Sequence, residues 1–230
     1  LRLALLGGDA AGYALDNPSA TVVEFSPADK RAGYLEKIAS CQSHISAGDV
    51  YQICLTTRLE AEFVGDALSY FLRLKKANPA PYASFIRVDG VEFASISPER
   101  FISVHGRKVL SSPIKGTRAR SNDPKQDQAL LEELGTDPKE RAENLMIVDL
   151  IRNDLSVACD PASIRVESLL AVKSFSTVHQ LVSDVSGVLQ EDKSGLDALL
   201  ALMPGGSMTG APKIRAMEIL SELESSDRGA

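Results

Sequence analysis

The stretch that decides the fold class is YASFIRVDGVEFASI, Tyr82–Ile96. Its two halves are rich in aromatic and β-branched residues, which favour strands, and they flank Asp89-Gly90, a dipeptide typical of tight hairpin turns. We therefore predict two antiparallel strands, over 82–87 and 91–96. Further strand pairs and helical patterns alternate along the chain, which favours an antiparallel α+β fold over a doubly wound parallel one.

Outside this hairpin, apolar spacing, turn residues and helix caps mark the other elements. Residues 1–25 show no clear period and are interpreted as a linker or the remnant of an upstream region, whereas 26–230 reads as one domain. Before the hairpin we expect a helix capped by Ser26 with Pro27 at its first position and ending at Gly48, a strand over 50–58 and a helix over 67–76. After it we expect a strand pair turning at His105-Gly106, an irregular segment over 112–124, and two helices, of which the second runs from Asp137-Pro138 to about Leu155. A strand pair over 164–172 and 178–185 and terminal helices complete the chain.

The composition limits the classes of function. A chain of 230 residues with 44% hydrophobic residues can bury a full core. Lys and Arg total 25 against 31 for Asp and Glu, and no dense basic run is present, so we expect no nucleic-acid partner. No apolar stretch is long enough to span a bilayer, so no membrane partner is expected either. Cys41, Cys54 and Cys159 are odd in number and lack metal-ligand spacing, which favours the reducing cytoplasm.

The glycine-rich loop PGGSMTGAPK, residues 204–213, leads into a helix, with Pro212 predicted in its first turn. Free N–H groups at such a helix start favour an anion, although a plain glycine-rich turn with a helix cap explains the pattern equally well. A nucleotide-binding P-loop is disfavoured, because Ala211 and Pro212 separate Gly210 from Lys213.

Three charged residues attract attention, and each also has an ordinary explanation. Lys115 lies in the predicted irregular segment and would ordinarily be a surface lysine. A free lysine has a pKa of about 10.4, so a nucleophilic role would require desolvation or a cationic neighbour. Glu99 follows a strand in Ser97-Pro98-Glu99-Arg100, where a solvated turn is the plain interpretation. Glu143 lies on a heavily charged helix and would ordinarily be exposed.

Six motifs, taken together and in order, are far more specific than any one of them: GDVYQICLT, SPERF, PIKGTR, RAENLMIVDLIRNDL, TVHQLVS and PGGSMTGAPKIRAMEIL. From about Ser26 to Gly229 the chain resembles the chorismate-utilising enzymes, which include anthranilate, aminodeoxychorismate, isochorismate and salicylate synthases. The resemblance implies an antiparallel β-sandwich with peripheral helices, incomplete at both ends in this chain. It also implies Mg²⁺ dependence and chorismate as substrate.

Two positions discriminate among the family's reactions. Members that add water to chorismate have a lysine general base at the position of Gln52, whereas members that add ammonia have glutamine. Among the aminating members, those that act at C2 and release pyruvate typically have alanine at the position of Lys115. The resemblance therefore implies amination at C4, on the way to 4-aminobenzoate and folate, with C2 amination as the alternative.

The resemblance also implies roles for individual residues. Lys115 would attack C2 of chorismate and Glu99 would act as general acid and base, which requires a site that favours its protonated form. Glu143 matches a Mg²⁺ ligand, while Thr209 and Gly210, like Gln52, match substrate-binding positions. Ammonia would come from a glutamine amidotransferase, on a separate chain or fused.

Two expectations go beyond these roles. The family normally continues past the last motif with further ligands, so we expect this chain alone to bind Mg²⁺ and chorismate poorly and to turn over little. A non-catalytic fragment that docks a partner therefore stays open as an alternative. Many members have histidine where this chain has Gln180, with His179 one place earlier; neighbours in a strand face opposite sides, so no catalytic histidine is assigned.

Overall fold

The computed structural model describes residues 21–22 and 24–228. The chain divides into two compact units, of which the first contains residues 58–98 with the chain ends and the second contains 29–57 and 99–227. Most of the predicted linker over 1–25 lies outside the described residues, so its boundary stays a prediction.

The first unit contains the hairpin that decided the fold class. Asp89 and Gly90 have φ angles of 48° and 81°, which is the left-handed geometry that a two-residue hairpin turn requires. The adjacent helix is capped by the Asp66 side chain and packs Phe71 on Phe85, with ring centroids 5.7 Å apart. The predicted helix and hairpin are thus confirmed. The elements of this unit are β1 (Thr21–Val22), β2 (Ser26–Pro27), β4 (Leu59–Glu60), β5 (Phe63–Val64), α2 (Ala67–Ala77), β6 (Tyr82–Val88) and β7 (Val91–Ser97).

The second unit is built on a five-stranded antiparallel sheet. Its long central strand, β12, pairs with β11 along one edge and with β10 and then β9 along the other, and β8 follows β9. Both predicted strand pairs are confirmed, as is the α+β class with antiparallel sheets. The strands are β8 (Arg100–His105), β9 (Lys108–Ser112), β10 (Ile114–Ala119), β11 (Arg165–Ser174) and β12 (Val178–Val188).

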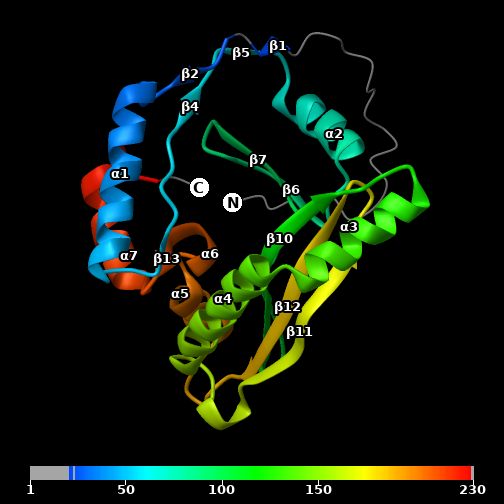
Figure 1. Cartoon of the computed structure of the whole chain (residues 1–230), viewed down its shortest axis with the longest axis vertical. Helices are drawn as coiled ribbons and strands as arrows, with labels where there is room; N and C mark the ends of the chain where they lie inside the picture. The colour runs from blue at the N-terminus through cyan, green and yellow to red at the C-terminus, as the bar shows by residue number, and fades with distance from the viewer. Residues whose placement is uncertain (1–20, 23, 229–230) are drawn as a thin grey trace. The chain divides into compact units, whose positions relative to one another are not determined.

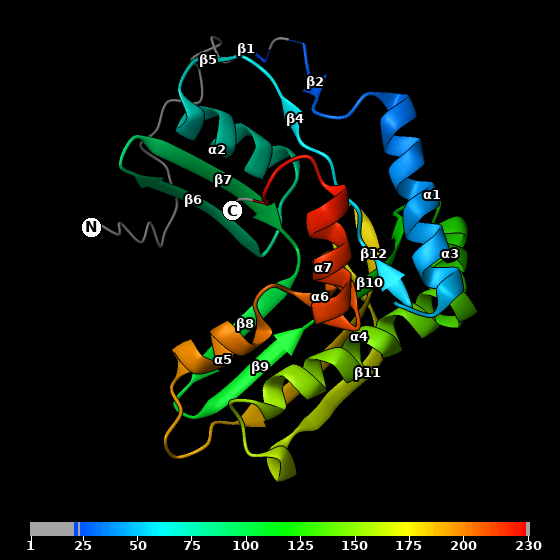
Figure 2. The same ribbon diagram turned by 90° about the vertical axis from the view of Figure 1, so that its left-hand side faces the viewer.

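Two long helices, α3 (Pro124–Thr136) and α4 (Pro138–Ser156), pack on this sheet across β10 and β12 (Figure 1). Each begins at an Asp-Pro pair, because the aspartate side chain accepts backbone N–H groups while proline needs no partner at the first position. Apolar side chains at helical spacing on α4 meet β9, β12 and α5 (Gly195–Leu202), which lies beside β8 and β9 (Figure 2). This contact forms the main core. Its buried residues are Val109, Ile147, Val148, Ile151, Leu155, Ala158, Cys159, Val185, Leu189, Ala198 and Leu202.

The rest of the second unit brings together segments that lie far apart in the sequence. A two-stranded ladder pairs Gln52 with Ala211 and Ile53 with Gly210, so the segment after the first helix lies beside the glycine-rich loop. The elements are α1 (Arg31–Ala47), β3 (Gln52–Ile53), a 3₁₀ turn (Pro161–Ser163), α6 (Gly206–Thr209), β13 (Gly210–Ala211) and α7 (Lys213–Leu223).

Three local predictions near the chain ends and the glycine-rich loop are wrong. The first helix begins at Arg31 instead of Pro27, because Ser26–Pro27 pairs as a strand with Leu59–Glu60; its end at Gly48 is confirmed. The strand predicted over 50–58 is reduced to Gln52–Ile53. Pro212 lies before the helix, with an extended ψ of 139°, instead of in its first turn.

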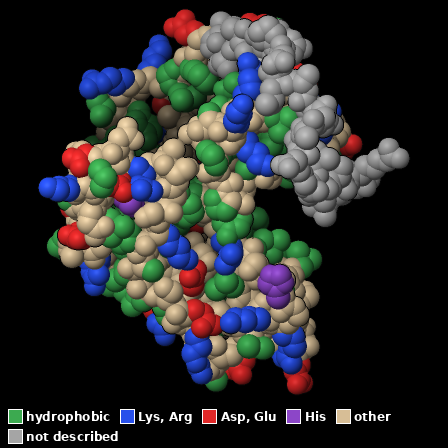
Figure 3. All heavy atoms as spheres, turned by 90° about the vertical axis from the view of Figure 1, so that its right-hand side faces the viewer, with side chains coloured by type: hydrophobic (Ala, Val, Ile, Leu, Met, Phe, Trp, Pro, Cys, Tyr) green, Lys and Arg blue, Asp and Glu red, His purple; other side chains and the backbone are tan. Residues whose placement is uncertain are grey.

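The surface of the described residues carries charges of both signs. On the face drawn in Figure 3, basic and acidic side chains are interspersed instead of gathered into separate areas. Within the described part of the chain, no helix is both long and apolar enough to cross a membrane.

Candidate active site

The short helix α6 brings two of the predicted site residues to one place. The Ser207 hydroxyl donates to the Glu99 carboxylate at 3.4 Å, and the Lys115 amine lies 3.4 Å from the Ser207 carbonyl oxygen. Both contacts are longer than an ideal hydrogen bond, which leaves room for the groups to rearrange around a ligand. Ser207 is distant in the sequence from both Glu99 and Lys115, and it is the neighbour that the two share.

Glu99 lies between β7 and β8 in a setting that changes its acidity. Burial raises the pKa of its carboxyl group, while the Ile114 backbone, the Ser207 hydroxyl and the Lys115 charge oppose the shift without cancelling it. A raised pKa favours the protonated form that a general acid needs. The fully solvated turn that the sequence also allowed is not what the structure contains.

Lys115 lies in a strand, not in the irregular loop predicted over 112–124. Ile114 pairs with Val182 and Thr117 with Gln180, so β10 contains one more residue than β12 over this interval. Such a β-bulge turns side chains out of the regular alternation and is common beside active sites. Gly116, with a φ of 94°, provides the left-handed residue within the bulge. Sequence reasoning missed this strand, because Gly116 and the two basic residues of β10 leave no alternation of apolar and polar positions.

Gln52, Thr209 and Gly210 meet at the β3–β13 ladder. A Cβ atom on Gly210 would lie 2.2 Å from the Gln52 carbonyl oxygen, and the φ of 141° also excludes most other residues. Thr209 is buried, its hydroxyl donates to the Gly205 carbonyl at 3.2 Å, and its own carbonyl accepts from the Cys54 N–H. The structure thus brings the three predicted substrate-binding residues together.

The side chain of Gln52 has an unused acceptor. Its Oε1 atom is buried and finds no hydrogen-bond partner among the described residues. An unsatisfied buried oxygen costs about 1–3 kcal/mol, so a ligand or water that donates to it would be favoured.

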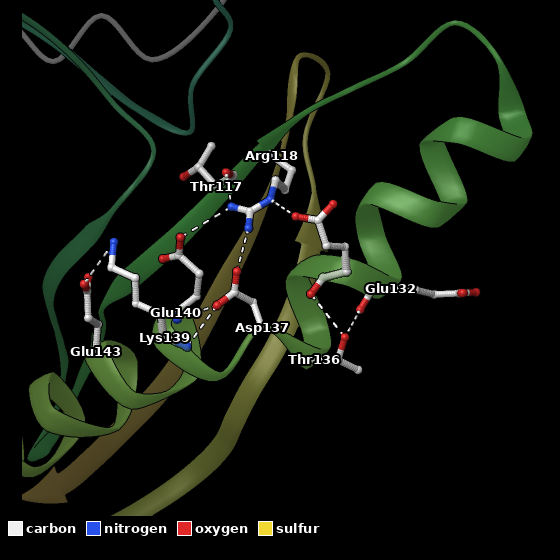
Figure 4. Close-up of polar contacts among 9 residues, drawn as sticks. Thr117, Arg118, Glu132, Thr136, Asp137, Lys139, Glu140 and Glu143 are labelled. Carbon is white, nitrogen blue, oxygen red and sulfur yellow. Dashed lines mark hydrogen bonds and ion pairs between the residues drawn. The ribbon is translucent and has the colours of Figure 1, made fainter.

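Glu143 lies on α4, where its carboxylate pairs with Lys139 at 3.6 Å (Figure 4). Within the described residues, no group of three or more His, Cys, Asp or Glu side chains could hold a metal ion. Mg²⁺ often takes only one or two protein carboxylates and completes its shell with water and substrate. A single carboxylate such as that of Glu143 therefore fits a Mg²⁺ ion whose other ligands are water and substrate.

His179 and Gln180, between which no catalytic histidine was assigned from the sequence, face opposite ways. His179 is buried toward α3, where its Nε2 atom contacts Asp127 at 3.0 Å and its Nδ1 atom contacts Ser174 at 2.8 Å. Gln180, its neighbour in the strand, therefore faces away from the helices, and its buried Oε1 finds no partner among the described residues. The His179 side chain fastens α3 to the sheet and does not take part in the group around Ser207.

Sequence reasoning missed one buried ion pair that supports the loop. Lys213 contacts Asp154 at 2.7 Å and also donates to the carbonyl groups of Ala201 and Leu202 at the end of α5. The lysine of the P-loop-like pattern is thus engaged within the fold. The four-residue spacing of Ile147, Ile151 and Leu155 places Asp154 next to an apolar stripe, which was the only signal in the sequence.

Comparison with known proteins agrees with this arrangement. Residues 10–230 match the model of the chorismate binding enzyme family. The chain belongs to the chorismate-binding enzymes. The resemblance inferred from the six motifs is thereby confirmed.

Two curated relatives support membership of this family. The chain is 46% identical over 200 residues to aminodeoxychorismate synthase component 1 of Klebsiella aerogenes, covering 87% of this chain and 44% of the relative. It is 42% identical to anthranilate synthase component 1 of Geobacillus stearothermophilus, covering 85% of this chain and 39% of the relative. The chorismate-binding chain therefore spans less than half the length of these relatives.

Among solved structures, anthranilate synthase component I from Streptococcus pneumoniae superposes with a TM-score of 0.83 at 33% identity, over 91% of this chain and 46% of that one. The isochorismate synthase MenF from Escherichia coli, at 21% identity and a TM-score of 0.77 over 91% of this chain and 49% of its own, supports the fold alone.

Proposed function

We propose that this chorismate-binding enzyme is part of an aminodeoxychorismate synthase, which aminates chorismate at C4 to give 4-amino-4-deoxychorismate. The observation that carries the proposal is the convergence of Lys115 and Glu99 on Ser207. The name of the 46% identical relative points the same way, whereas the anthranilate synthase relative is somewhat less similar. Lysine at position 115 favours C4 amination over the anthranilate alternative.

In the proposed reaction, the Lys115 amine attacks C2 of chorismate, the ring double bonds shift, and the C4–O bond breaks. Glu99 gives its proton to the departing hydroxyl group, which leaves as water. Ammonia then attacks C4, the double bonds shift back, and the bond between C2 and the lysine nitrogen breaks. Covalent catalysis replaces one difficult displacement by two easier ones.

Gln52 supports ammonia over water as the second reactant. Its amide has no basic group that could deprotonate water, whereas its buried oxygen could accept a hydrogen bond from an N–H or O–H of a bound molecule. Ammonia needs no such deprotonation to act as a nucleophile. We therefore propose that Gln52 contacts the substrate together with Thr209 and Gly210.

The proposal includes a metal and a partner. Glu143 would provide one carboxylate to Mg²⁺, which when bound neutralises negative charge on the substrate. A glutamine amidotransferase would supply the ammonia, and the name "component 1" of the Klebsiella relative is in keeping with a second component. A cytoplasmic location, in keeping with three free cysteines among the described residues, is part of the same proposal.

Product analysis tests the proposal directly. The full-length gene product, given chorismate, Mg²⁺ and ammonium, is expected to yield 4-amino-4-deoxychorismate by liquid chromatography with mass detection. Formation of fluorescent anthranilate with release of pyruvate would instead support C2 amination. Binding of an amidotransferase without any product, and without heat on titration with chorismate and Mg²⁺, would indicate a docking role.

Glu99→Gln is expected to lower amination by about 10²–10⁴-fold and to raise the melting temperature at neutral pH. Burial raises the pKa of Glu99 in the folded state, so this group stabilises the fold below its unfolded pKa. That contribution is lost as pH rises through the folded pKa. Glutamine does not ionise, so the variant's melting temperature should exceed the parent's increasingly from about pH 4 upward.

Glu191→Gln, at an exposed carboxylate, is the matched control and should follow the parent at each pH. Melting curves between about pH 4 and pH 8 measure the difference. A Glu99→Gln variant with the parent's activity would contradict the general-acid role, and one with the parent's pH profile of stability would contradict the raised pKa.

A further inference from the structure

Arg118, three residues after Lys115, is held by carboxylates from two helices. Its guanidinium group contacts Glu133 on α3 at 2.8 Å, Asp137 at the α3–α4 junction at 2.8 Å, and Glu140 on α4 at 3.4 Å. Figure 4 shows the arginine directed from β10 toward the start of α4. Hydrogen bonding to Glu133 raises the pKa of Arg118 further, and the Glu140 N–H lowers that of Asp137, so these groups are charged at neutral pH.

Glu140 also supports the bulge that contains Lys115. A Cβ atom on Gly116 would lie 3.0 Å from the Glu140 Cβ and 3.2 Å from its Oε2, while the Oε1 atom of the same carboxylate contacts Arg118. One face of the bulge is therefore in van der Waals contact with α4. Leu134 of α3 closes the same side, also 3.0 Å from that Cβ position.

These contacts hold the backbone that directly follows Lys115. Gly116 packs against Glu140, and the Glu140 carboxylate accepts a hydrogen bond from Arg118 at 3.4 Å. Gly116 and Arg118 face α3 and α4. The neighbouring Lys115 is therefore turned the other way, toward Ser207 of α6.

We infer that Arg118 is a positioning residue, which holds the Gly116 bulge against α4 through Glu140 and thereby sets the direction of the Lys115 amine. That the positioned amine is a nucleophile rests on the proposed function; the positioning itself does not. The planar group of Arg118 can meet three carboxylates at once, which a lysine ammonium cannot do in the same geometry.

The test compares Arg118→Gln and Glu140→Gln with two matched controls in the chain itself. Arg120→Gln removes a nearby arginine, which pairs with Asp127 instead of with the partners of Arg118. Glu133→Gln removes the most exposed carboxylate partner of Arg118. The first readout is amide hydrogen exchange over 113–118. The second is the rate of trace acylation of Lys115, normalised to the exposed Lys76 and read by peptide mass spectrometry.

Arg118→Gln and Glu140→Gln are expected to speed exchange at 115–117 by about tenfold and to change the acylation rate of Lys115. Both controls should match the parent in these readouts, and Arg118→Lys should restore only part of the protection. Parent-like exchange and acylation in Arg118→Gln would overturn the inference, as would an equal change in Arg120→Gln. Because neither readout uses chorismate, both test the positioning role of Arg118 even if the proposed reaction is wrong.

Discussion

Lys115→Ala in the full-length gene product is expected to lower C4 amination on the order of 10³-fold or more, since the variant loses the nucleophile of the first step. Lys115→Arg should be nearly as inactive, because it keeps the positive charge but offers no basic amine at neutral pH. Steady-state rates with saturating ammonium measure the effect. The two variants together separate a covalent role from a purely electrostatic one.

Lys108→Ala is the matched control, because Lys108 is an exposed lysine of the same sheet and pairs with Glu167. It should keep the parent rate. Amination in Lys115→Ala at the parent rate would remove the lysine from the mechanism. If Lys115→Arg alone kept the parent rate, positive charge and not nucleophilicity would be the function of this position.

Gly210→Ala is expected to destabilise the fold by about 3 kcal/mol and to separate β3 from β13. The new methyl group would lie 2.2 Å from the Gln52 carbonyl oxygen, and the backbone φ of 141° is unfavourable for alanine. The neighbours cannot relax easily, because the closest atom belongs to the backbone. Urea unfolding followed by circular dichroism measures the loss.

Gly33→Ala provides the matched control on α1, where a Cβ atom would meet nothing within 4 Å. Alanine is the better helix former, so this variant should be more stable by about 0.5–1 kcal/mol. A Gly210→Ala variant as stable as the parent would show that the ladder can open without cost. The close packing of Gly210 on Gln52 would then not be required.

Much of the fold follows from local signals in the sequence. Asp89-Gly90 predicts its hairpin because few residues tolerate left-handed geometry at both turn positions. Asp137-Pro138 predicts the start of α4 because the side chain and the ring satisfy the first turn locally. Such elements need no knowledge of distant partners.

Elements that depend on distant partners could not be predicted in the same way. β10 was expected to be irregular, because its pairing with β12 joins residues far apart in sequence and contains a bulge. Similarly, Ser26–Pro27 carries a helix-start signal, but pairing with Leu59–Glu60 overrides it.

In the candidate site too, some features could be predicted from the sequence and others depend on distant contacts. Motif resemblance named Lys115, Glu99 and Gln52, but the burial that raises the pKa of Glu99 depends on how the chain folds around it. The roles of His179 and Gln180 depended on which face of β12 the helices cover. His179 contacts Asp127 of α3, so its side chain lies on the face of β12 that the helices cover, and the Gln180 side chain lies on the opposite face.

The central claim is that Lys115 forms a bond to the substrate while Glu99 protonates the leaving group. The most direct measurement is peptide mapping after the full-length gene product is mixed with chorismate and Mg²⁺ without ammonia and quenched in acid. We predict that the peptide containing Lys115 gains the mass of chorismate less one water, and that later addition of ammonium before the quench removes this adduct. An unmodified Lys115 peptide, from enzyme that forms 4-amino-4-deoxychorismate at its full rate once ammonia is added, would contradict the account.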